Sequence, residues 1–555
     1  MLYPPPFCKF NRNRRRVHML YTGAQIVMEC LLEQGVDRVF GYPGNAALKI
    51  YDALYEYRDS IHHVLMTHEQ HAAHAADGYA RATGRTGVAL STSGPGATNL
   101  LTGLSASHMD STPVVAITCN VNRPSIGKDS FQEVDIYGVS MPVTKHNYMV
   151  KDVHALADTL RSAFRIASSG RPGPVLVDIL SDVAEAECEF SPRPPARPAP
   201  VLHADSVDLL AASSLIDEAA RPMFIAGGGI ISAGAEAELL ALAEKLHAPV
   251  ALTLMGIGAF PATHPLYAGM LGMFGTPAAA ECLAESDLVI AVGTRLSDRS
   301  IPSRDCIGPD ARLLHIDIDA AEINKNLPAD ISLIGDAQEL LSRLLQSVSE
   351  KKENVLCSHI EPPLLAMPAS PGLHPAQILS RLGKMAGPGQ IYTTEVGEHQ
   401  IWAASFLPIG GPRKFLTPGG LGAMGFGLGA AIGAAFGTGE RIINIAGDGS
   451  FYMNLAELST AMAYHLPILE IVFNNKTLGM VRQMQKTACG GRLSAVDLNR
   501  PTDFLALSRA FGAKAYRIAA REDIAGVLQS ALAASRQGPC VVECVIDPEE
   551  AVFAK

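Results

Sequence analysis

Two oxygen-bearing side chains in the last third of the chain stand just after neighbouring apolar runs. Asp448 lies in Gly447-Asp448-Gly449, and Asn475 follows after a stretch that is compatible with one helix. A carboxylate and an amide carbonyl are hard oxygen ligands, which Mg²⁺ takes together with phosphate oxygens. The flanking glycines allow the backbone to approach a diphosphate closely. We therefore predict a magnesium and diphosphate site; the alternative is a strand that ends in a tight structural turn.

A second candidate, Glu69, stands near the start of a stretch from Thr67 to Arg81 that has the composition of a helix. A carboxyl group buried in an apolar pocket is held partly protonated and transfers a proton better than one in water. The simpler interpretation is an acidic residue at a helix start, which the helix dipole stabilises. Because a diphosphate site is predicted in the same chain, we favour proton transfer by Glu69.

Three histidines in the same stretch, His68, His71 and His74, raise the question of a zinc site. Their spacing differs from His-Glu-x-x-His, and no further soft ligand lies nearby in the sequence. We therefore predict no zinc here. Downstream, the segment from Ser93 to Asn99 is a turn that opens a helix, and it suits close approach of a cofactor or a partner subunit.

The elements that must position these groups alternate along the whole chain. Apolar runs typical of buried strands are separated by stretches rich in alanine and leucine that fit helices. Such alternation predicts an α/β protein with doubly wound parallel sheets covered on both faces. The predicted strands are Val114 to Thr118, Val175 to Ile179, Met223 to Ala226, Leu288 to Val292, Leu313 to Ile318, Ile442 to Ala446, Ile468 to Phe473 and Val541 to Ile546.

Two segments interrupt this pattern and divide the chain. Residues 191 to 200 contain five prolines, and residues 350 to 375 are rich in proline and charge. Proline runs cannot continue a helix or a central strand and form stiff exposed spacers. We therefore predict three domains, at residues 19–188, 204–348 and 374–555.

Composition restricts the class of protein further. The chain has 555 residues, of which 48% are hydrophobic and 18% charged, and this is a globular composition. A net charge of -10 argues against a nucleic-acid partner, which would require a basic face. The ten cysteines include no Cys-x-x-Cys pair, so we expect reduced thiols and a cytoplasmic protein.

Two segments imitate membrane or targeting signals. From Thr417 to Gly439 there is no charge, but the glycines contribute little transfer energy, so we predict a loop and a closely packed buried helix instead of a membrane span. Residues 1 to 18 are arginine-rich and lack an apolar core, which argues against a secretory signal. We interpret Met19, which directly precedes the recognisable pattern, as the true start; the alternative is Met1.

Several segments, which occur in a fixed order along the chain, indicate a specific enzyme family and not only a class of cofactor. They are Phe40-Gly41-Tyr42-Pro43-Gly44, Thr92 to Asn99, Phe131-Gln132-Glu133-Val134-Asp135, Arg171-Pro172-Gly173-Pro174-Val175, Gly422 to Gly427 and Leu478 to Val481. Across residues 21 to 548 they resemble the catalytic subunit of acetolactate synthase (acetohydroxyacid synthase), a family of thiamine diphosphate (ThDP) enzymes.

The resemblance implies a reaction, an architecture and an assembly. Family members release CO₂ from one 2-keto acid, usually pyruvate, and join the remainder to a second 2-keto acid, giving 2-acetolactate. They consist of pyrimidine-binding, central and diphosphate-binding domains, and their active sites lie across the interface of a dimer. A homodimer or homotetramer is therefore expected, and a regulatory small subunit is a further partner that the family allows.

The resemblance also assigns roles to residues of this sequence. Glu69 would hydrogen-bond the aminopyrimidine ring of ThDP, and Met424 would hold the two cofactor rings in a bent shape, with the carbonyl of Gly422 accepting from the ring amino group. Arg299 would receive the carboxylate of the second keto acid. The remaining assignments are Gln132 and Lys145 along the substrate approach, Gly397, His399, Gly447, Gly449 and Ser450 at the diphosphate, and Asp448, Asn475 and the Thr477 carbonyl on Mg²⁺.

The central region carries a weaker dinucleotide signal. A strand-like run is followed by Gly227 and Gly228, although Gly-x-Gly-x-x-Gly is absent. In biosynthetic relatives this domain binds FAD, and Arg295, Asp317 and Asp336 are compatible with that cofactor. The alternative is a purely structural sheet.

Some residues depart from the family pattern. Met484 stands where biosynthetic relatives have a tryptophan that favours 2-ketobutyrate, Asn45 and Lys49 replace a glycine and a proline, and Glu398 replaces a glutamine beside the diphosphate. We therefore predict weak discrimination between pyruvate and 2-ketobutyrate. The alternative functions are a 2-hydroxyacyl-CoA lyase, a sulfoacetaldehyde acetyltransferase or a pyruvate-oxidase-like enzyme on the same scaffold.

Overall fold

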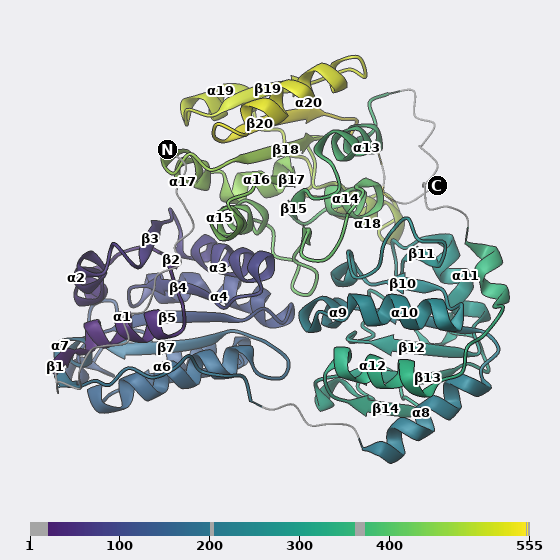
Figure 1. Cartoon of the computed structure of the whole chain (residues 1–555). Coiled ribbons are helices and arrows are strands. Elements are labelled where there is room, and N and C mark those ends of the chain that lie inside the picture. The colour runs from purple at the N-terminus through teal and green to yellow at the C-terminus, as the bar shows by residue number, and fades with distance from the viewer. Residues whose placement is uncertain (1–19, 200–204, 361–371, 551, 553–555) are drawn as a thin grey trace.

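The computed structural model describes residues 20–199, 205–360, 372–550 and 552. Three six-stranded sheets lie in three lobes, and helices pack on both faces of each sheet (Figure 1). Every strand pair within these sheets is parallel. The predicted α/β class with three doubly wound parallel sheets is confirmed. Met1 and Met19, the two candidate start residues, lie outside the described residues.

The first sheet belongs to the N-terminal lobe, drawn in purple and blue in Figure 1. Its order is β3 (His62–Leu65), β2 (Arg38–Gly41), β4 (Gly87–Ser91), β5 (Val114–Asn120), β7 (Val175–Leu180) and β6 (His146–Val150). Its helices are α1 (Gly23–Glu33), α2 (Leu48–Glu56), α3 (Glu69–Thr83), α4 (Pro95–Met109), α5 (Ile136–Ser140), α6 (Val153–Ser168) and α7 (Ser181–Glu185). A short antiparallel pair, β1 (Leu20–Thr22) and β8 (Glu187–Glu189), brings the two ends of this lobe together.

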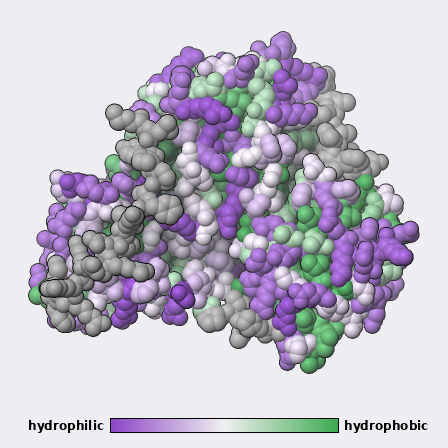
Figure 2. Space-filling view, in the orientation of Figure 1, coloured by the Kyte–Doolittle hydropathy of each residue, from purple (hydrophilic) through white to green (hydrophobic). Residues whose placement is uncertain are grey.

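The second sheet forms the central lobe. Its order is β11 (Tyr267–Met270), β10 (Val250–Leu252), β9 (Pro222–Ala226), β12 (Leu288–Val292), β13 (Arg312–Asp317) and β14 (Ile331–Ile334). The helices are α8 (Ser206–Glu218), α9 (Gly228–Ala233), α10 (Glu236–Leu246), α11 (Pro277–Glu285) and α12 (Ala337–Ser347). In the face shown in Figure 2, hydrophobic residues gather where Figure 1 places α8, whose Val207 and Leu210 are exposed.

The third sheet forms the C-terminal lobe, drawn in green and yellow in Figure 1. Its order is β16 (Phe415–Leu416), β15 (Ile391–Thr394), β17 (Ile442–Gly447), β18 (Ile468–Asn474), β20 (Cys540–Val545) and β19 (Lys514–Ile518). The helices are α13 (Pro375–Ala386), α14 (Glu398–Phe406), α15 (Gly427–Thr438), α16 (Asp448–Asn454), α17 (Glu457–Ala463), α18 (Gly479–Ala488), α19 (Phe504–Ala510) and α20 (Asp523–Ala534).

In each sheet the strand order reverses direction beside the strand that comes first in the chain. The reversal lies between β2 and β4, between β9 and β12, and between β15 and β17. In open parallel sheets, ligands bind in the crevice that such a reversal leaves at the carboxyl ends of the strands. The topology therefore points to one crevice in each lobe, and the sequence motifs with glycine follow the strands that border them.

The charge-free stretch from Thr417 to Gly439 is a loop followed by α15, as predicted. The helix packs so closely on α3 that a Cβ atom added to Gly433 would lie 1.8 Å from the Ala75 carbonyl oxygen, and one added to Gly78 would lie 2.1 Å from the Ala430 oxygen. Recurring glycines thus serve backbone contact between two lobes of a globular protein. In the described chain no helix has the length and apolar character that a bilayer crossing requires.

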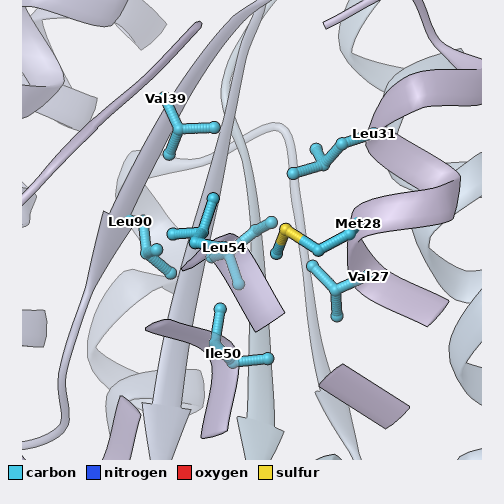
Figure 3. A pocket seen from close by; sticks show the side chains of 8 residues that line it. Val27, Met28, Leu31, Val39, Ile50, Leu54 and Leu90 are labelled. Carbon is cyan, nitrogen blue, oxygen red and sulfur yellow. The ribbon is translucent and has the colours of Figure 1, made fainter. Parts of the chain in front are cut away.

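The cores are apolar: one is shared by the N-terminal and C-terminal lobes across α3 and α15, and another lies within the N-terminal lobe. Figure 3 shows side chains of the N-terminal core that point toward one another between α1, α2 and the sheet; they include Val27, Met28 and Leu31 from α1 and Ile50 and Leu54 from α2. The space between them has no polar lining. This part of the N-terminal lobe is therefore packing, and chemistry must be sought at the crevices.

Candidate active site

A pocket opens in the C-terminal lobe at the crevice between β15 and β17. Its walls come from the segments that follow β15, β17 and β18, together with the loop before α15 and the first turn of α18. The lining residues are Val396, Gly397, Glu398, His399, Trp402, Met424, Gly447, Asp448, Gly449, Ser450, Phe473, Asn475, Thr477, Leu478, Gly479, Met480, Val481 and Ile546. The pocket therefore brings together the residues predicted for Mg²⁺ and those predicted for the diphosphate.

Asp448 and Asn475 meet because β17 and β18 are neighbours in the sheet. Asp448 accepts hydrogen bonds from the backbone N–H of Gly449 at 2.9 Å and of Lys476 at 3.1 Å, and Asn475 Oδ1 accepts from the N–H of Thr477 at 3.1 Å. These bonds fix both side chains at the mouth of the crevice. Burial raises the pKa of Asp448 to about 6, so a nearby cation would stabilise its charged form.

The oxygen donors at this position suit magnesium better than a softer metal. Asp448 supplies a carboxylate, Asn475 an amide oxygen, and Thr477 a backbone carbonyl, since the Thr477 hydroxyl already donates to Val496 O at 3.0 Å. Among the described residues, no three His, Cys, Asp or Glu side chains are grouped to hold a metal. A metal site at this pocket would thus use the Asn475 and Thr477 oxygens.

His399 fills the space between two of the predicted glycines. A Cβ atom added to Gly397 would lie 2.7 Å from the His399 ring, and one added to Gly447 would lie 2.8 Å from it, so neither position tolerates a side chain. Burial lowers the pKa of His399 to about 3, and its Nε2 atom has no partner within the described part of the chain. A buried polar atom without a partner at a pocket wall indicates a ligand.

Ser450 and Glu398 are the other polar groups of the wall. Ser450 donates to Val396 O at 3.1 Å, and Glu398 Oε2 accepts from Asn475 Nδ2 at 3.3 Å. Burial raises the pKa of Glu398 to about 8, while Arg482 and Lys486 lower it. Because its carboxyl group is paired and mostly protonated at neutral pH, Glu398 repels a diphosphate less than a free carboxylate would.

The loop before α15 brings Met424 to the wall of the pocket, and Gly422 of the same loop lies near the pocket residue Val396. The methyl carbon of Met424 lies 3.8 Å from where a Cβ on Gly449 would be. Gly422 has a φ of 69°, which favours glycine. The buried Glu395 accepts hydrogen bonds from this loop and was missed by the sequence analysis, although its place between a strand and Gly397 was a signal.

Glu69 lies outside this pocket within a single chain. It begins α3 and is 9% exposed, and its Oε2 atom accepts from Asn99 Nδ2 at 2.9 Å. A Cβ added to Gly96 would lie 3.1 Å from Glu69 Oε1, so the predicted turn from Ser93 to Asn99 packs directly on the carboxylate. Glu69 therefore sits at the crevice end of the N-terminal sheet, on a different lobe from Asp448.

The predicted substrate residues also lie away from the pocket in one chain. Gln132 packs its backbone against Gly94 in the N-terminal lobe, where a Cβ on Gly94 would lie 2.6 Å from Gln132 O. Lys145 donates to Ile166 O at 2.5 Å and to Ser169 O, and burial lowers its pKa to about 8. Arg299 lies in the central lobe, where its side chain is exposed and its Nε atom is 3.8 Å from Oδ2 of Asp298.

The central crevice lies between the ends of β9 and β12. Gly227 N donates to Val292 O, and a Cβ on Gly227 would lie 2.2 Å from Gly293 O, so Gly227 serves backbone packing and Gly228 starts α9. Asp336 caps α12 by accepting from Glu339 N at 3.1 Å.

Two charged side chains of the central lobe, Arg295 and Asp317, make few hydrogen bonds within the described residues. Burial and the charge of Arg171 lower the pKa of Arg295, and no hydrogen bond or ion pair of its guanidinium occurs among the described residues. Asp317 ends β13, accepts from Asp319 N at 2.9 Å and has a pKa raised by burial. A half-buried cation without a partner near the crevice is a feature expected of an anion site.

Comparison with known proteins assigns a class to this geometry. The sequence matches "Thiamine pyrophosphate enzyme, N-terminal TPP binding domain" over residues 21–139, "Thiamine pyrophosphate enzyme, central domain" over residues 209–344 and "Thiamine pyrophosphate enzyme, C-terminal TPP binding domain" over residues 395–544. The third match contains the whole pocket wall except Ile546. The chain is thus a thiamine pyrophosphate enzyme in its domain content.

Relatives that match this chain over nearly its full length identify the family within this class of enzymes. The chain is 43% identical to the probable acetolactate synthase large subunit of Methanocaldococcus jannaschii, over 96% of this chain and 93% of that protein. It is 45% identical to the acetolactate synthase large subunit of Parasynechococcus marenigrum, over 92% and 86%. It is 42% identical to the large subunit of Corynebacterium glutamicum, over 99% and 91%. The chain belongs to the acetolactate synthase large-subunit family.

Proposed function

We propose that this protein decarboxylates pyruvate and joins the remaining two-carbon unit to a second 2-keto acid, giving 2-acetolactate when that acid is pyruvate. The observation that carries the proposal is full-length similarity to acetolactate synthase large subunits together with a pocket lined by Asp448, Asn475 and Met424. ThDP, when bound, supplies an acidic ring C–H and an electron sink for decarboxylation. The side chains of the protein bind, orient and protonate around that group.

The pocket residues divide this work among them. Asp448, Asn475 and the Thr477 carbonyl would hold Mg²⁺, which in turn holds the diphosphate. Neutral His399, with its free Nε2, and the backbone of Gly449 would contact phosphate oxygens. The apolar side chains of Met424, Leu478 and Phe473 exclude water, which favours loss of CO₂ from a carboxylate beside a cationic ring.

The site is incomplete in one chain, and we propose that a second copy completes it. Glu69 is held near the crevice end of its own sheet but does not line the pocket of its own chain. Glu69 of a second copy would hydrogen-bond the aminopyrimidine ring and hold a proton there. Exposed apolar residues near the same edge, Phe131 at 81% and Met141 at 56%, support burial against another copy. A homodimer is the smallest assembly that satisfies this, and a homotetramer would contain it.

The test is to identify the product that purified protein forms from pyruvate with ThDP and Mg²⁺. Formation of 2-acetolactate and CO₂ in a ratio of about one to one supports the proposal, since each condensation releases one carboxyl group. Acetate formation with an electron acceptor would favour a pyruvate-oxidase-like enzyme. Turnover only with a 2-hydroxyacyl-CoA would favour a lyase of that substrate, and turnover only with sulfoacetaldehyde would favour a sulfoacetaldehyde acetyltransferase.

FAD binding in the central lobe is a further part of the proposal. The half-buried guanidinium of Arg295 follows the end of β12 by three residues, and the carboxylate of Asp317 ends the neighbouring strand β13, so both lie beside the β9 and β12 crevice. An acidic residue at a strand end suits a ribose hydroxyl, and a cation suits a diphosphate. Released flavin, measured by absorbance after denaturing the purified protein, supports this; a flavin-free protein that makes acetolactate at full rate contradicts it.

We further propose a cytoplasmic enzyme that has a regulatory small subunit. Relatives carry the name large subunit, and the described cysteines are all free thiols, which suits a reducing compartment. A smaller polypeptide that purifies with the chain and changes acetolactate output when added back supports the partner. An output that no co-purified polypeptide changes contradicts it.

A further inference from the structure

The loop from Gly422 to Phe426 carries two groups that the proposed reaction needs, yet it has no regular secondary structure. Gly422 and Gly425 have φ values of 69° and 90°, so the backbone is unusual at two points on either side of Met424. A loop of this kind has many accessible conformations when nothing holds it. Something must therefore fix Met424 if it is to shape a cofactor.

Glu395, at the end of β15, provides this restraint. Its Oε2 atom accepts from Gly425 N at 2.7 Å, and its Oε1 atom accepts from Gly427 N at 2.8 Å and from Leu428 N at 3.3 Å. Asn454 Nδ2 donates to the same Oε1 atom. Glu395 is fully buried. Three of these four donors are backbone groups within four residues of Met424.

A row of polar side chains on three neighbouring strands lies beside these contacts, and its own hydrogen bonds do not include Glu395. Thr393 Oγ1 donates to Asn444 Oδ1 at 2.8 Å, and Asn444 Nδ2 donates to Glu470 Oε1 at 2.7 Å. Gly427 fits between them, because a Cβ added there would lie 2.3 Å from Asn444 Oδ1 and 2.8 Å from Glu395 Oε1. The start of α15 is thus packed directly against Asn444 and Glu395, while Glu470 reaches it only through Asn444.

Burial raises the pKa of Glu395 to about 7, whereas the hydrogen bonds that it accepts from Gly425, Asn454, Leu428 and Gly427 lower the pKa and so favour the carboxylate. The four groups that hydrogen-bond Glu395 are all donors, and a side chain with two acceptor oxygens satisfies both sides at once. Glutamine has one oxygen, so whichever way its amide turns, an N–H group of the side chain faces an N–H group of Asn454 or of the loop. Hydrogen bonds to a charged acceptor are about twice as strong as neutral ones.

We propose that Glu395 is a positioning residue, which fixes the backbone of the Met424 loop so that Met424 and the Gly422 carbonyl meet the cofactor rings in the reactive arrangement. The inference rests on the proposed ThDP function, because Met424 and Gly422 matter only if that cofactor binds. Glu395 touches neither cofactor nor substrate in this account. It acts through the loop, and a displacement of about 1 Å at a reacting group costs on the order of 100-fold in rate.

The test compares Glu395→Gln with Glu470→Gln. Both remove a buried carboxylate of the same sheet, but Glu470 contacts Asn444 and no residue of the Gly422–Leu428 loop among the described hydrogen bonds. The main readout is the rate at which the C2 proton of bound ThDP exchanges with deuterium, measured by NMR after an acid quench. Binding of ThDP is followed by the fluorescence of Trp402, the single tryptophan, which lines the pocket.

We expect Glu395→Gln to slow C2 exchange about 100-fold, as a shift of about 1 Å would. The Kd for ThDP should rise less than about tenfold, since the Mg²⁺ and diphosphate contacts remain. Glu470→Gln should exchange within about twofold of the unaltered protein, because it leaves the loop contacts intact. Equal exchange in Glu395→Gln and the unaltered protein, or equal losses in both variants, would overturn the proposal.

Two further measurements keep the test decisive if Glu395→Gln does not fold. Glu395→Asp keeps the charge but is shorter by one methylene, so it should slow exchange while retaining most of the ThDP affinity; unchanged exchange would count against the proposal. In the unaltered, cofactor-free protein, the amides of Gly425, Gly427 and Leu428 should be as protected from hydrogen exchange as those of β17, and rapid exchange there would contradict it.

A failure of this inference is distinguishable from a failure of the proposed function. C2 exchange requires only bound ThDP and no keto acid. If the unaltered protein exchanges the C2 proton but makes no 2-acetolactate, the proposed reaction is wrong and the role of Glu395 is still measured. If it makes 2-acetolactate and Glu395→Gln exchanges normally, only the positioning role is wrong.

Discussion

Replacing Glu69 by glutamine removes a proton-holding group while preserving its shape. Glu69 Oε2 accepts one hydrogen bond, from Asn99 Nδ2 at 2.9 Å, and a glutamine oxygen can accept the same bond. The free energy of unfolding should therefore change by less than about 1 kcal/mol. The Kd for ThDP should stay within about tenfold, because the Mg²⁺ and diphosphate contacts lie on another lobe.

The loss of turnover should be far larger than the loss of binding. General acid–base catalysis contributes about 10²- to 10⁴-fold, which is about 3 to 5 kcal/mol in the activation free energy. We expect kcat for 2-acetolactate formation to fall by that factor in Glu69→Gln. The assay is acetolactate production at saturating pyruvate, ThDP and Mg²⁺, with Trp402 fluorescence as the binding measurement in the same preparation.

Glu457→Gln is the matched control for this experiment. Glu457 is also buried beside the start of α3, where it accepts from the N–H groups of Thr67 at 3.0 Å and His68 at 3.1 Å. Its replacement should cost about 1 to 2 kcal/mol of stability, with kcat within about threefold. Near-normal turnover in Glu69→Gln, or an equal loss of kcat in Glu457→Gln, would refute the proton-transfer role.

Three more predictions concern specificity, packing and pH. Met484→Trp on α18 should raise the preference for 2-ketobutyrate over pyruvate by about 10- to 100-fold, because one additional methylene in contact with an apolar pocket changes discrimination by about that factor. A competition assay with both acids measures this preference, and an unchanged product ratio would contradict the prediction. Gly433→Ala should destabilise the protein by more than about 2 kcal/mol in urea unfolding, because the added Cβ would lie 1.8 Å from the Ala75 carbonyl oxygen; a smaller change would mean that α3 and α15 pack less closely. Burial raises the pKa of Glu470 well above its usual 4.5, so the contribution of Glu470 to stability is full below pH 4.5 and is lost as the pH rises through the folded-state pKa. Relative to Glu470→Gln, the unaltered protein should therefore lose stability from pH 5 to pH 8. Parallel stability curves for the two proteins would refute this.

The elements of the fold that the sequence predicts best are the buried ones. The predicted strands Leu288 to Val292 and Ile442 to Ala446 coincide with β12 and β17 to within one residue, because a strand covered on both faces reads as a continuous apolar run. Short strands such as β10 and β16 were not predicted, since two or three residues carry no periodic signal.

The site was predictable where it depends on neighbouring strands. Asp448 and Asn475 each follow a strong apolar run, and adjacent parallel strands bring their carboxyl ends together. The position of Glu395 between a strand and Gly397 is visible in the sequence, but its role is not, because that role arises from contacts with Gly425 and Gly427, which lie about 30 residues further along the chain and are brought close by the fold. The domain bounds and the roles of Lys145 and Arg299 stay predictions.

The central claim, that one active site takes Glu69 from one copy and Asp448 from another, has a direct measurement. Glu69→Gln and Asp448→Asn homodimers, each inactive, are mixed under conditions that exchange subunits, and acetolactate formation is followed. If the site is shared, half of the dimers become hybrids with one intact site of two, and activity returns to about one quarter of the unaltered level. If both residues act within one chain, every site in the mixture keeps a lesion and no activity returns.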